Sequence, residues 1–119
     1  MNAKLALIAV GLLFVAAPTL AAPTLAPGRP AQCNVTSGDG RYDGPCRFTP
    51  TGKGSFSVSA PKFRRLMGAT DISVYPIGGG KAEVRGLTSD GINSRWGEAT
   101  RSKTNKACWI GTDFKVCAR

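Results

Sequence analysis

The sequence predicts a small antiparallel all-β domain, either a sandwich or a partly open barrel, stapled by two disulfide bonds. Short segments of alternating apolar and polar residues recur about every ten residues, as in small β domains. Clusters of glycine, proline and aspartate separate these segments and are typical of tight turns. Four cysteines are placed near the two ends of the domain. No helical periodicity of useful length competes with this pattern.

The chain begins with the pattern of an export signal, which we place at residues 1–21. Lys4 is the only charge before an uncharged run from Leu5 to Ala17, and small residues follow through Ala22. That run is shorter than the roughly 20 residues that a membrane-spanning helix needs. We therefore expect cleavage after Ala21 and a periplasmic or secreted protein whose mature chain has no transmembrane segment.

Residues 22–32 follow as a proline-rich stretch that contains Pro23, Pro27 and Pro30. Because proline fixes φ and lacks an N–H donor, this stretch is predicted to be an extended, flexible arm without packed structure. The remaining residues, 33–119, are short enough for one domain.

Within that domain, each strand is expected where residues alternate. Phe56 and Val58 should share one face, as should Ala82 and Val84. Residues 61–69 alone suit one or two turns of helix. The expected strands are 46–48, 55–59, 72–75, 81–85, 94–101, 108–110 and 114–117, and the expected turns include 37–40, 42–45, 51–54, 77–80, 89–91 and 111–113.

Four cysteines in an exported chain predict two disulfides. Three pairings are arithmetically possible, and we favour Cys33–Cys46 with Cys108–Cys117, because each closes a short loop between turn-rich strands. A metal site is disfavoured, since the chain has no histidine and neither cysteine pair has the short spacing of zinc knuckles.

The same absences argue against an enzyme. Without histidine the chain lacks the commonest general base, and paired cysteines leave no thiol nucleophile. Most of the 7 acidic residues lie beside glycine or in predicted turns. Catalysis by a pair of carboxylates or by a Ser–Lys dyad remains formally possible, but the sequence contains no motif for either. We predict no catalytic residue and no cofactor.

Charge is the main indication of function. The net charge is +9, and loss of Lys4 with the leader leaves 15 basic and 7 acidic side chains, or +8. Natural partners are lipopolysaccharide, anionic lipid, nucleic acid or an acidic protein. A basic surface without a dedicated ligand is an equally ordinary interpretation. Two stretches mix cations with apolar or aromatic residues, and we predict ligand binding by Arg64, Arg65, Arg95, Trp96, Arg101 and Lys103.

Both stretches also have a plainer interpretation. Residues 62–67 could form a solvated loop whose apolar members pack into the core, and Trp96 could be an ordinary core residue.

The two ends of the domain carry a family resemblance. Two sequence segments resemble small uncharacterised exported proteins of Gram-negative bacteria. The first is the opening Cys33 with Gly44-Pro45-Cys46-Arg47-Phe48, and the second is the closing Trp96-Gly97-Glu98-Ala99 with Cys108-Trp109-Ile110-Gly111, Phe114 and Cys117-Ala118-Arg119. The resemblance implies export and paired cysteines, and it transfers no active-site residue.

The leading functional prediction is a non-enzymatic exported β domain that binds an anionic envelope component or another polyanion. The alternative is a protein inhibitor of an acidic exported enzyme, acting through an exposed turn such as 77–80. A lysozyme inhibitor is a disfavoured version, because lysozymes are basic and would be repelled by a chain near +8.

Overall fold

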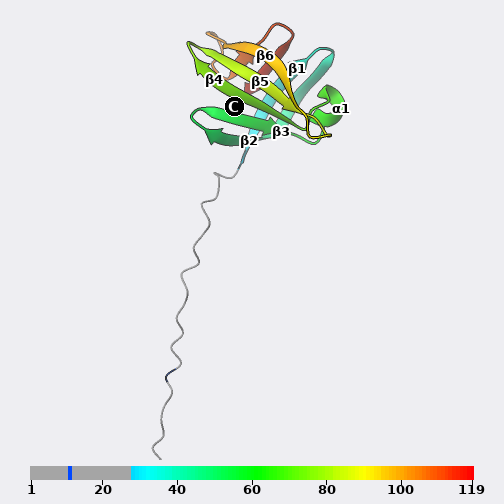
Figure 1. The fold of residues 1–119 in the computed structure, drawn as a ribbon, viewed down its shortest axis with the longest axis vertical. Coiled ribbons are helices and arrows are strands. Elements are labelled where there is room, and N and C mark those ends of the chain that lie inside the picture. Colours follow the sequence, from blue (N-terminus) through cyan, green and yellow to red (C-terminus); the bar gives the residue numbers. More distant parts are fainter. Residues whose placement is uncertain (1–10, 12–27) are drawn as a thin grey trace, which may run out of the picture.

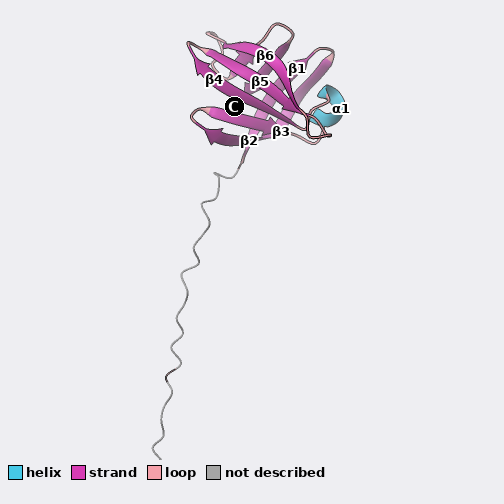
Figure 2. Cartoon of the chain, in the orientation of Figure 1, coloured by secondary structure: helices cyan, strands magenta, loops and turns pink. Residues whose placement is uncertain are grey.

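Residues 28–119 form an eight-stranded antiparallel barrel with one short helix (Figures 1 and 2). The computed structural model describes Gly11 and residues 28–119, so the rest of the predicted leader and residues 22–27 of the predicted arm lie outside the described residues. The elements are β1 (Arg29–Ser37), β2 (Gly40–Gly52), β3 (Ser55–Ser59), α1 (Phe63–Met67), β4 (Asp71–Gly78), β5 (Lys81–Leu87), β6 (Asn93–Arg101), β7 (Cys108–Ile110) and β8 (Phe114–Ala118).

Every strand pairs with its neighbours in sequence, and β1 also pairs with β8 to close the barrel. The all-β antiparallel prediction is therefore confirmed. Of the two architectures that the sequence left open, the barrel is correct, and it is closed rather than partly open. Closure gives each strand a partner on both sides over part of its length, which removes the exposed edges of an open sheet.

The start of β1 corrects one predicted boundary. Residues 29–32, predicted to belong to the flexible arm, form the first part of β1, and Ala31 is buried. Pro30 is tolerated there because β1 pairs only with β2 at that point, and the β1–β8 ladder begins at Cys33. Beyond the ladder, Gln32 exchanges two backbone hydrogen bonds with Arg119.

The predicted turn at 42–45 is wrong, because these residues belong to the long strand β2. Their glycine and proline suggest a turn, yet they pair with residues 32–35 of β1. Pro45 fits since β2 pairs with β3 only from Arg47 onward, so its missing N–H faces no second ladder.

Both predicted disulfides are confirmed. Cys33 and Cys46 join β1 to β2 with Cα atoms 5.7 Å apart, and Cys108 and Cys117 face each other on β7 and β8 with Cα atoms 4.0 Å apart. No cysteine remains free. Each bridge thus ties neighbouring strands of the sheet.

The core lies inside the barrel and consists of the inward residues of successive strands. Phe56 and Val58 are buried on one face, and Ala82 and Val84 on another, as the alternation predicts. Fully buried side chains come from β1, β3, β4, β5, β6, β8 and α1, and the largest are Phe63, Ile72, Val35, Val58, Val74, Val84 and Val116.

The helix lies at one end of the barrel, between the end of β3 and the start of β4 (Figure 1), as predicted for 61–69. Phe63 is fully buried there and packs edge-on against Tyr42, with ring centroids 5.0 Å apart. Gly40 lies so close to the Leu66 carbonyl that a Cβ at position 40 would collide with it. We call this end of the barrel the helix end.

Candidate binding site at the opposite end of the barrel

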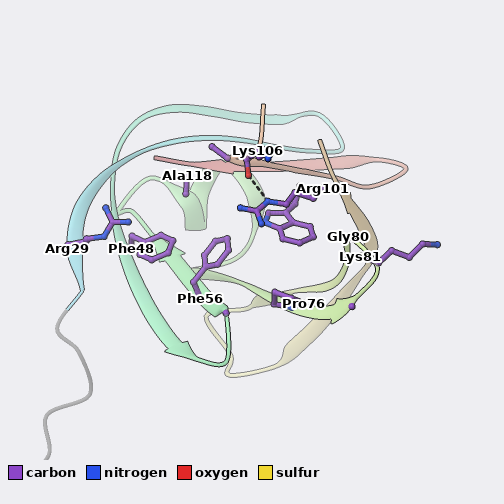
Figure 3. A pocket seen from close by; sticks show the side chains of 13 residues that line it. Arg29, Phe48, Phe56, Pro76, Gly80, Lys81, Arg101, Lys106 and Ala118 are labelled. Atoms are coloured by element: carbon purple, nitrogen blue, oxygen red, sulfur yellow. Dashed lines mark hydrogen bonds between the residues drawn. The ribbon is translucent and has the colours of Figure 1, made fainter. Parts of the chain in front are cut away.

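The other end of the barrel holds a cavity of about 530 Å³ (Figure 3). Its lining comes from the start of β1, the β2–β3 and β4–β5 hairpins, the segment between β6 and β7, and the end of β8. Because β3 runs from this lining to α1, the cavity and the helix lie at opposite ends. We call this the cavity end. Its volume falls within the roughly 300–1,000 Å³ of small-molecule pockets.

Aromatic rings form two walls of the cavity. Phe48 and Phe56 stack with centroids 4.8 Å apart, and both point into the ring of strands in Figure 3. Trp109 on β7 contributes another aromatic surface. Phe56 and Trp109 are only 9% and 6% exposed, so they belong to the core as well as to the cavity. A ligand reaching these rings must enter the barrel.

Two arginines cap these rings at the rim. Arg29 lies directly opposite Phe48 in the β1–β2 register, and its guanidinium carbon is 4.5 Å from the ring centroid. Arg101 lies opposite Trp109 in the β6–β7 register, with a corresponding distance of 5.4 Å. Directly opposed residues project to the same face, so each pair forms a cation–π contact inside the rim.

Arg101 is further held by a hydrogen bond from its Nε to the Lys106 backbone carbonyl, at 2.9 Å. This bond and the stacking on Trp109 fix the guanidinium at the rim. Its two terminal nitrogens have no acceptor among the described residues. The side chain is therefore oriented while retaining donors for a ligand.

No aspartate or glutamate is among the residues that line the cavity. Within the described part of the chain, the ion pairs are Lys81–Glu98, Arg85–Glu83 and Arg95–Glu83, so neither rim arginine has a carboxylate partner. Lys81 also belongs to the lining, but it is paired to Glu98 and points away from the cavity in Figure 3. The cavity end thus carries uncompensated positive charge.

A second hollow of about 370 Å³ adjoins the cavity beside the segment between β6 and β7. Arg101, Lys103 and Lys106 line it together with the glycines of the β4–β5 turn. These three cations, which we call the cationic loop, are all exposed. No acidic residue occurs between Glu98 and Asp113, so the segment carries no opposing charge of its own.

The structure separates residues that the sequence suggested would act together. Arg95 and Trp96 are neighbours, yet Arg95 points outward and Trp96 packs inward against Phe114, with ring centroids 5.8 Å apart. Trp96 is the extra residue of a β-bulge, because Val84 pairs with Gly97 and Arg85 pairs with Arg95. The structure therefore does not bring Trp96 together with Arg95, Arg101 and Lys103 on one surface; Trp96 is half-buried and packs against the core, in agreement with its plainer interpretation.

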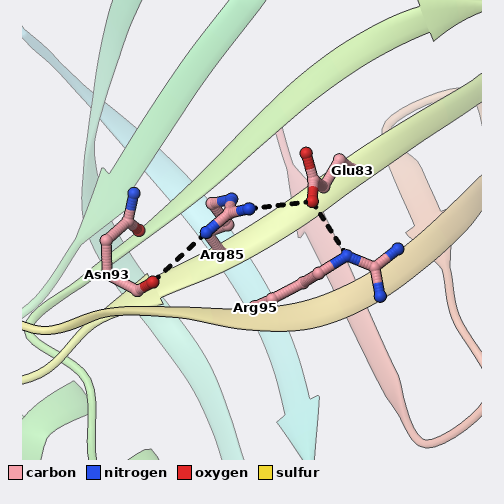
Figure 4. Close-up of polar contacts among 4 residues, drawn as sticks. All are labelled: Glu83, Arg85, Asn93 and Arg95. Atoms are coloured by element: carbon pink, nitrogen blue, oxygen red, sulfur yellow. Dashed lines mark hydrogen bonds and ion pairs between the residues drawn. The ribbon is translucent and has the colours of Figure 1, made fainter.

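Arg95 is instead engaged on the outer wall of the barrel (Figure 4). One oxygen of Glu83 accepts hydrogen bonds from Arg95 Nε at 2.9 Å and from Arg85 at 3.1 Å. The bond from Arg95, with a further contribution from Arg85, lowers the pKa of Glu83 below its ordinary value, although desolvation opposes this shift. Arg95 is thus occupied by a neighbour rather than directed at the cavity.

Arg64 and Arg65 lie on the exposed side of α1, at the helix end. The apolar members of the same stretch face the protein: Phe63 is buried, and Leu66 and Met67 are half-buried. The six predicted residues therefore divide into two exposed arginines at the helix end, two residues on the β6 wall and two cations at the cavity end.

Several cavity residues escape the sequence-based prediction, namely Arg29, Phe48, Phe56, Lys106 and Trp109. The predicted arm includes Arg29, and the aromatic residues are predicted only as strand positions. One signal is present: if Cys33 bonds Cys46 in adjacent antiparallel strands, Arg29 falls near Phe48. Placing Arg29 opposite Phe48 requires the register of the two strands. The Cys33–Cys46 disulfide alone fixes that register only to within a residue or two.

Within residues 28–119, no group of three or more cysteine or acidic residues could hold a metal ion. No helix in that part of the chain is long and apolar enough to cross a membrane. Comparison of the chain with protein-family models, with curated proteins and with solved structures finds no match.

Proposed function

We propose that this protein is a non-enzymatic, exported binding domain whose cavity end binds an anionic envelope component or another polyanion. The observation that carries the proposal is the pair of oriented rim arginines above a cavity without acidic residues. Lipopolysaccharide, anionic lipid and nucleic acid share the phosphate or carboxylate groups that such a rim would recognise.

The charge distribution supports the cavity end over the outer wall. On the wall, Glu83 and Glu98 neutralise part of the charge of Arg85, Arg95 and Lys81. At the rim, Arg29 and Arg101 have aromatic neighbours and no carboxylate within the described residues. An anion arriving there displaces no existing ion pair, so the guanidinium donors are available to it.

Export is part of the proposal. The leader pattern at residues 1–21 supports it, and the two disulfides suit an oxidising compartment such as the periplasm or the cell exterior. Arg64 and Arg65 form a second exposed basic patch, but α1 offers them neither a cavity nor an aromatic surface. We therefore assign them a lesser role in long-range attraction.

Retention on immobilised lipopolysaccharide and on heparin tests this proposal. The triple variant R101Q/K103Q/K106Q removes the cationic loop, and K62Q/R64Q/R65Q removes the same charge from the helix end. Loss of three anion contacts should reduce the slope of log affinity against log salt by about 2 to 3. We expect that reduction, with much weaker retention, in the first variant only.

Equal loss in the two variants would overturn the proposal, because it would mean diffuse attraction to a basic surface. The proposal also fails if the unmodified protein is not retained at physiological salt. At that salt concentration, interactions between exposed charges are screened beyond about 8 Å, so only close contacts with the anion hold the protein on the column.

The inhibitor alternative retains one supporting observation. Ile77 is 61% exposed and precedes three consecutive glycines with positive φ in the β4–β5 turn. An exposed apolar residue on a protruding turn suits insertion into a partner protein. Salt-resistant capture of an acidic protein, lost in I77D and retained in R101Q/K103Q/K106Q, would replace polyanion binding with this function.

A further inference from the structure

We infer that the cavity end recognises a single-chain anionic amphiphile, whose apolar tail enters the barrel while its anionic head stays at the arginine rim. This inference rests on the proposed function and narrows its ligand class. It follows from the layering of the site, in which aromatic surface lies below and cations lie above.

The lower layer is apolar. Phe48, Phe56, Pro76, Trp109 and Ala118 supply its side chains, and none of them carries a charge. The stacked pair Phe48–Phe56 lies on one side, and Trp109 belongs to β7 on another part of the circumference. Each methylene that moves from water to such a surface makes the free energy of binding more favourable by about 0.8 kcal/mol. Burial of an aliphatic tail in the cavity is therefore favourable.

The upper layer is cationic. Arg29 approaches from β1 and Arg101 from the end of β6, and in Figure 3 they lie on opposite sides of the opening. Both guanidinium groups are held against rings rather than against carboxylates. A carboxylate or phosphate at the centre of the opening can therefore pair with either arginine without displacing an internal partner.

This layering disfavours an extended nucleic acid as the occupant of the cavity. Proteins that bind single strands present exposed aromatic faces on which successive bases stack. Here Phe56 and Trp109 are buried and face a closed ring of strands, so consecutive bases cannot reach both of them. A narrow tail can, because it enters along the barrel axis.

Decanoate is a suitable probe, because it combines a ten-carbon tail with one carboxylate. We expect the purified, disulfide-bonded protein to bind decanoate below its micelle concentration with one-to-one stoichiometry in calorimetry. Acetate tests the head alone, and decyl maltoside tests the same tail with a neutral head. Acetate should not bind measurably, and decyl maltoside should bind about tenfold or more weakly, because the charged hydrogen bonds are missing.

The two tryptophans provide an internal control for the location. Trp109 lines the cavity, whereas Trp96 packs against Phe114 and does not belong to the lining. In a ¹H–¹⁵N NMR titration with decanoate, the indole N–H signal of Trp109 should shift and that of Trp96 should stay in place. The substitution W96F assigns the two signals.

Two variants separate the layers. A118F fills the cavity without changing charge and should abolish decanoate binding, while A118S keeps the volume and should retain it. R101Q should weaken decanoate about tenfold and leave decyl maltoside unchanged. Circular dichroism of each variant shows whether the barrel is intact, and R101Q keeps the test decisive if A118F does not fold.

The inference fails if decanoate does not bind at millimolar concentration, if A118F folds and binds it as well as the unmodified protein, or if Trp96 shifts instead of Trp109. Acetate binding as tight as decanoate binding also overturns it. In each case the proposed function stands on its own test, since R101Q/K103Q/K106Q can still lose retention on lipopolysaccharide or heparin.

Discussion

The two ends of the barrel are closed in different ways. A small barrel has two open ends, and each must be filled or left accessible to water. At the helix end, α1 inserts Phe63 against Tyr42 and approaches Gly40 closely. At the cavity end, aromatic side chains line the opening but leave about 530 Å³ unfilled. One end is packed for stability, and the other keeps space that packing would otherwise remove.

Local sequence explains this difference. The helix end is connected by a segment long enough to fold back as a helical turn, which ends at Gly68 in the left-handed conformation. The β2–β3 and β4–β5 hairpins at the cavity end are tight turns that contain glycine, such as Gly79 and Gly80, and neither folds back as a helix over the opening. Arg29 and Arg101 lie at this rim. The helix end of the barrel thus contributes stability, and the cavity end leaves space for a ligand.

The largest expected effect is at the helix end. Phe63→Ala removes a fully buried ring and should lower the free energy of unfolding by about 3 to 5 kcal/mol. Phe48→Ala, at the cavity end, removes a ring that is only partly buried and should cost about 1 to 2 kcal/mol. Urea denaturation measures both. Equal losses would remove the distinction between a packed and an open end.

The next largest expected loss of stability comes from removing a disulfide. Removal of Cys33–Cys46 by C33A/C46A should lower the free energy of unfolding by about 2 to 4 kcal/mol, because the bridge restricts the unfolded chain. This bridge also joins the strands that bring Arg29 opposite Phe48. Decanoate binding by the folded variant then shows whether the ladder alone holds that register. A stability loss well under about 1 kcal/mol would contradict the expected role of the bridge.

Substitutions at two glycines allow the stability cost of a steric clash to be compared with that of backbone strain. Gly40→Ala should cost about 1 to 3 kcal/mol, because its Cβ meets the Leu66 backbone carbonyl, which cannot move without the helix. Gly79→Ala meets no atom within 4 Å but has a φ of +64°, so it should cost only about 1 kcal/mol of conformational strain. Thermal unfolding of the two variants ranks them, and a larger loss at Gly79 would reverse the comparison.

The smallest effect concerns the outer wall between the two ends. The folded-state pKa of Glu83 lies below its ordinary value, so its ionised form adds stability above that value and loses it as the pH falls through the folded pKa. Glu83→Gln should lower the melting temperature slightly near neutral pH and make no difference in strong acid. Since the Glu83 carboxylate is only half-buried and reaches solvent, salt should reduce the effect. A loss that persists in strong acid would point to packing rather than charge.

The class of fold and its covalent staples follow from short stretches of the sequence. Alternation at 55–59 and 81–85 is sufficient to predict strands with Phe56, Val58, Ala82 and Val84 inside, because a strand projects side chains to opposite faces with a period of two. Local loop closure predicts both disulfides. The apolar spacing in 61–69 predicts the short helix α1. All of these depend on residues close together in the chain.

Closure, register and the partner of each cation depend on contacts between strands. Pairing of β1 with β8 joins the two ends of the domain, and no local pattern specifies it. Trp96 is the extra residue of the β6 bulge and packs inward, whereas Arg95 points outward and donates a hydrogen bond to Glu83. Arg101 meets Trp109, eight positions further along, because the β6–β7 register opposes them. A strand's period fixes which face a residue occupies, whereas contacts across strands depend on register, which a single inserted residue shifts.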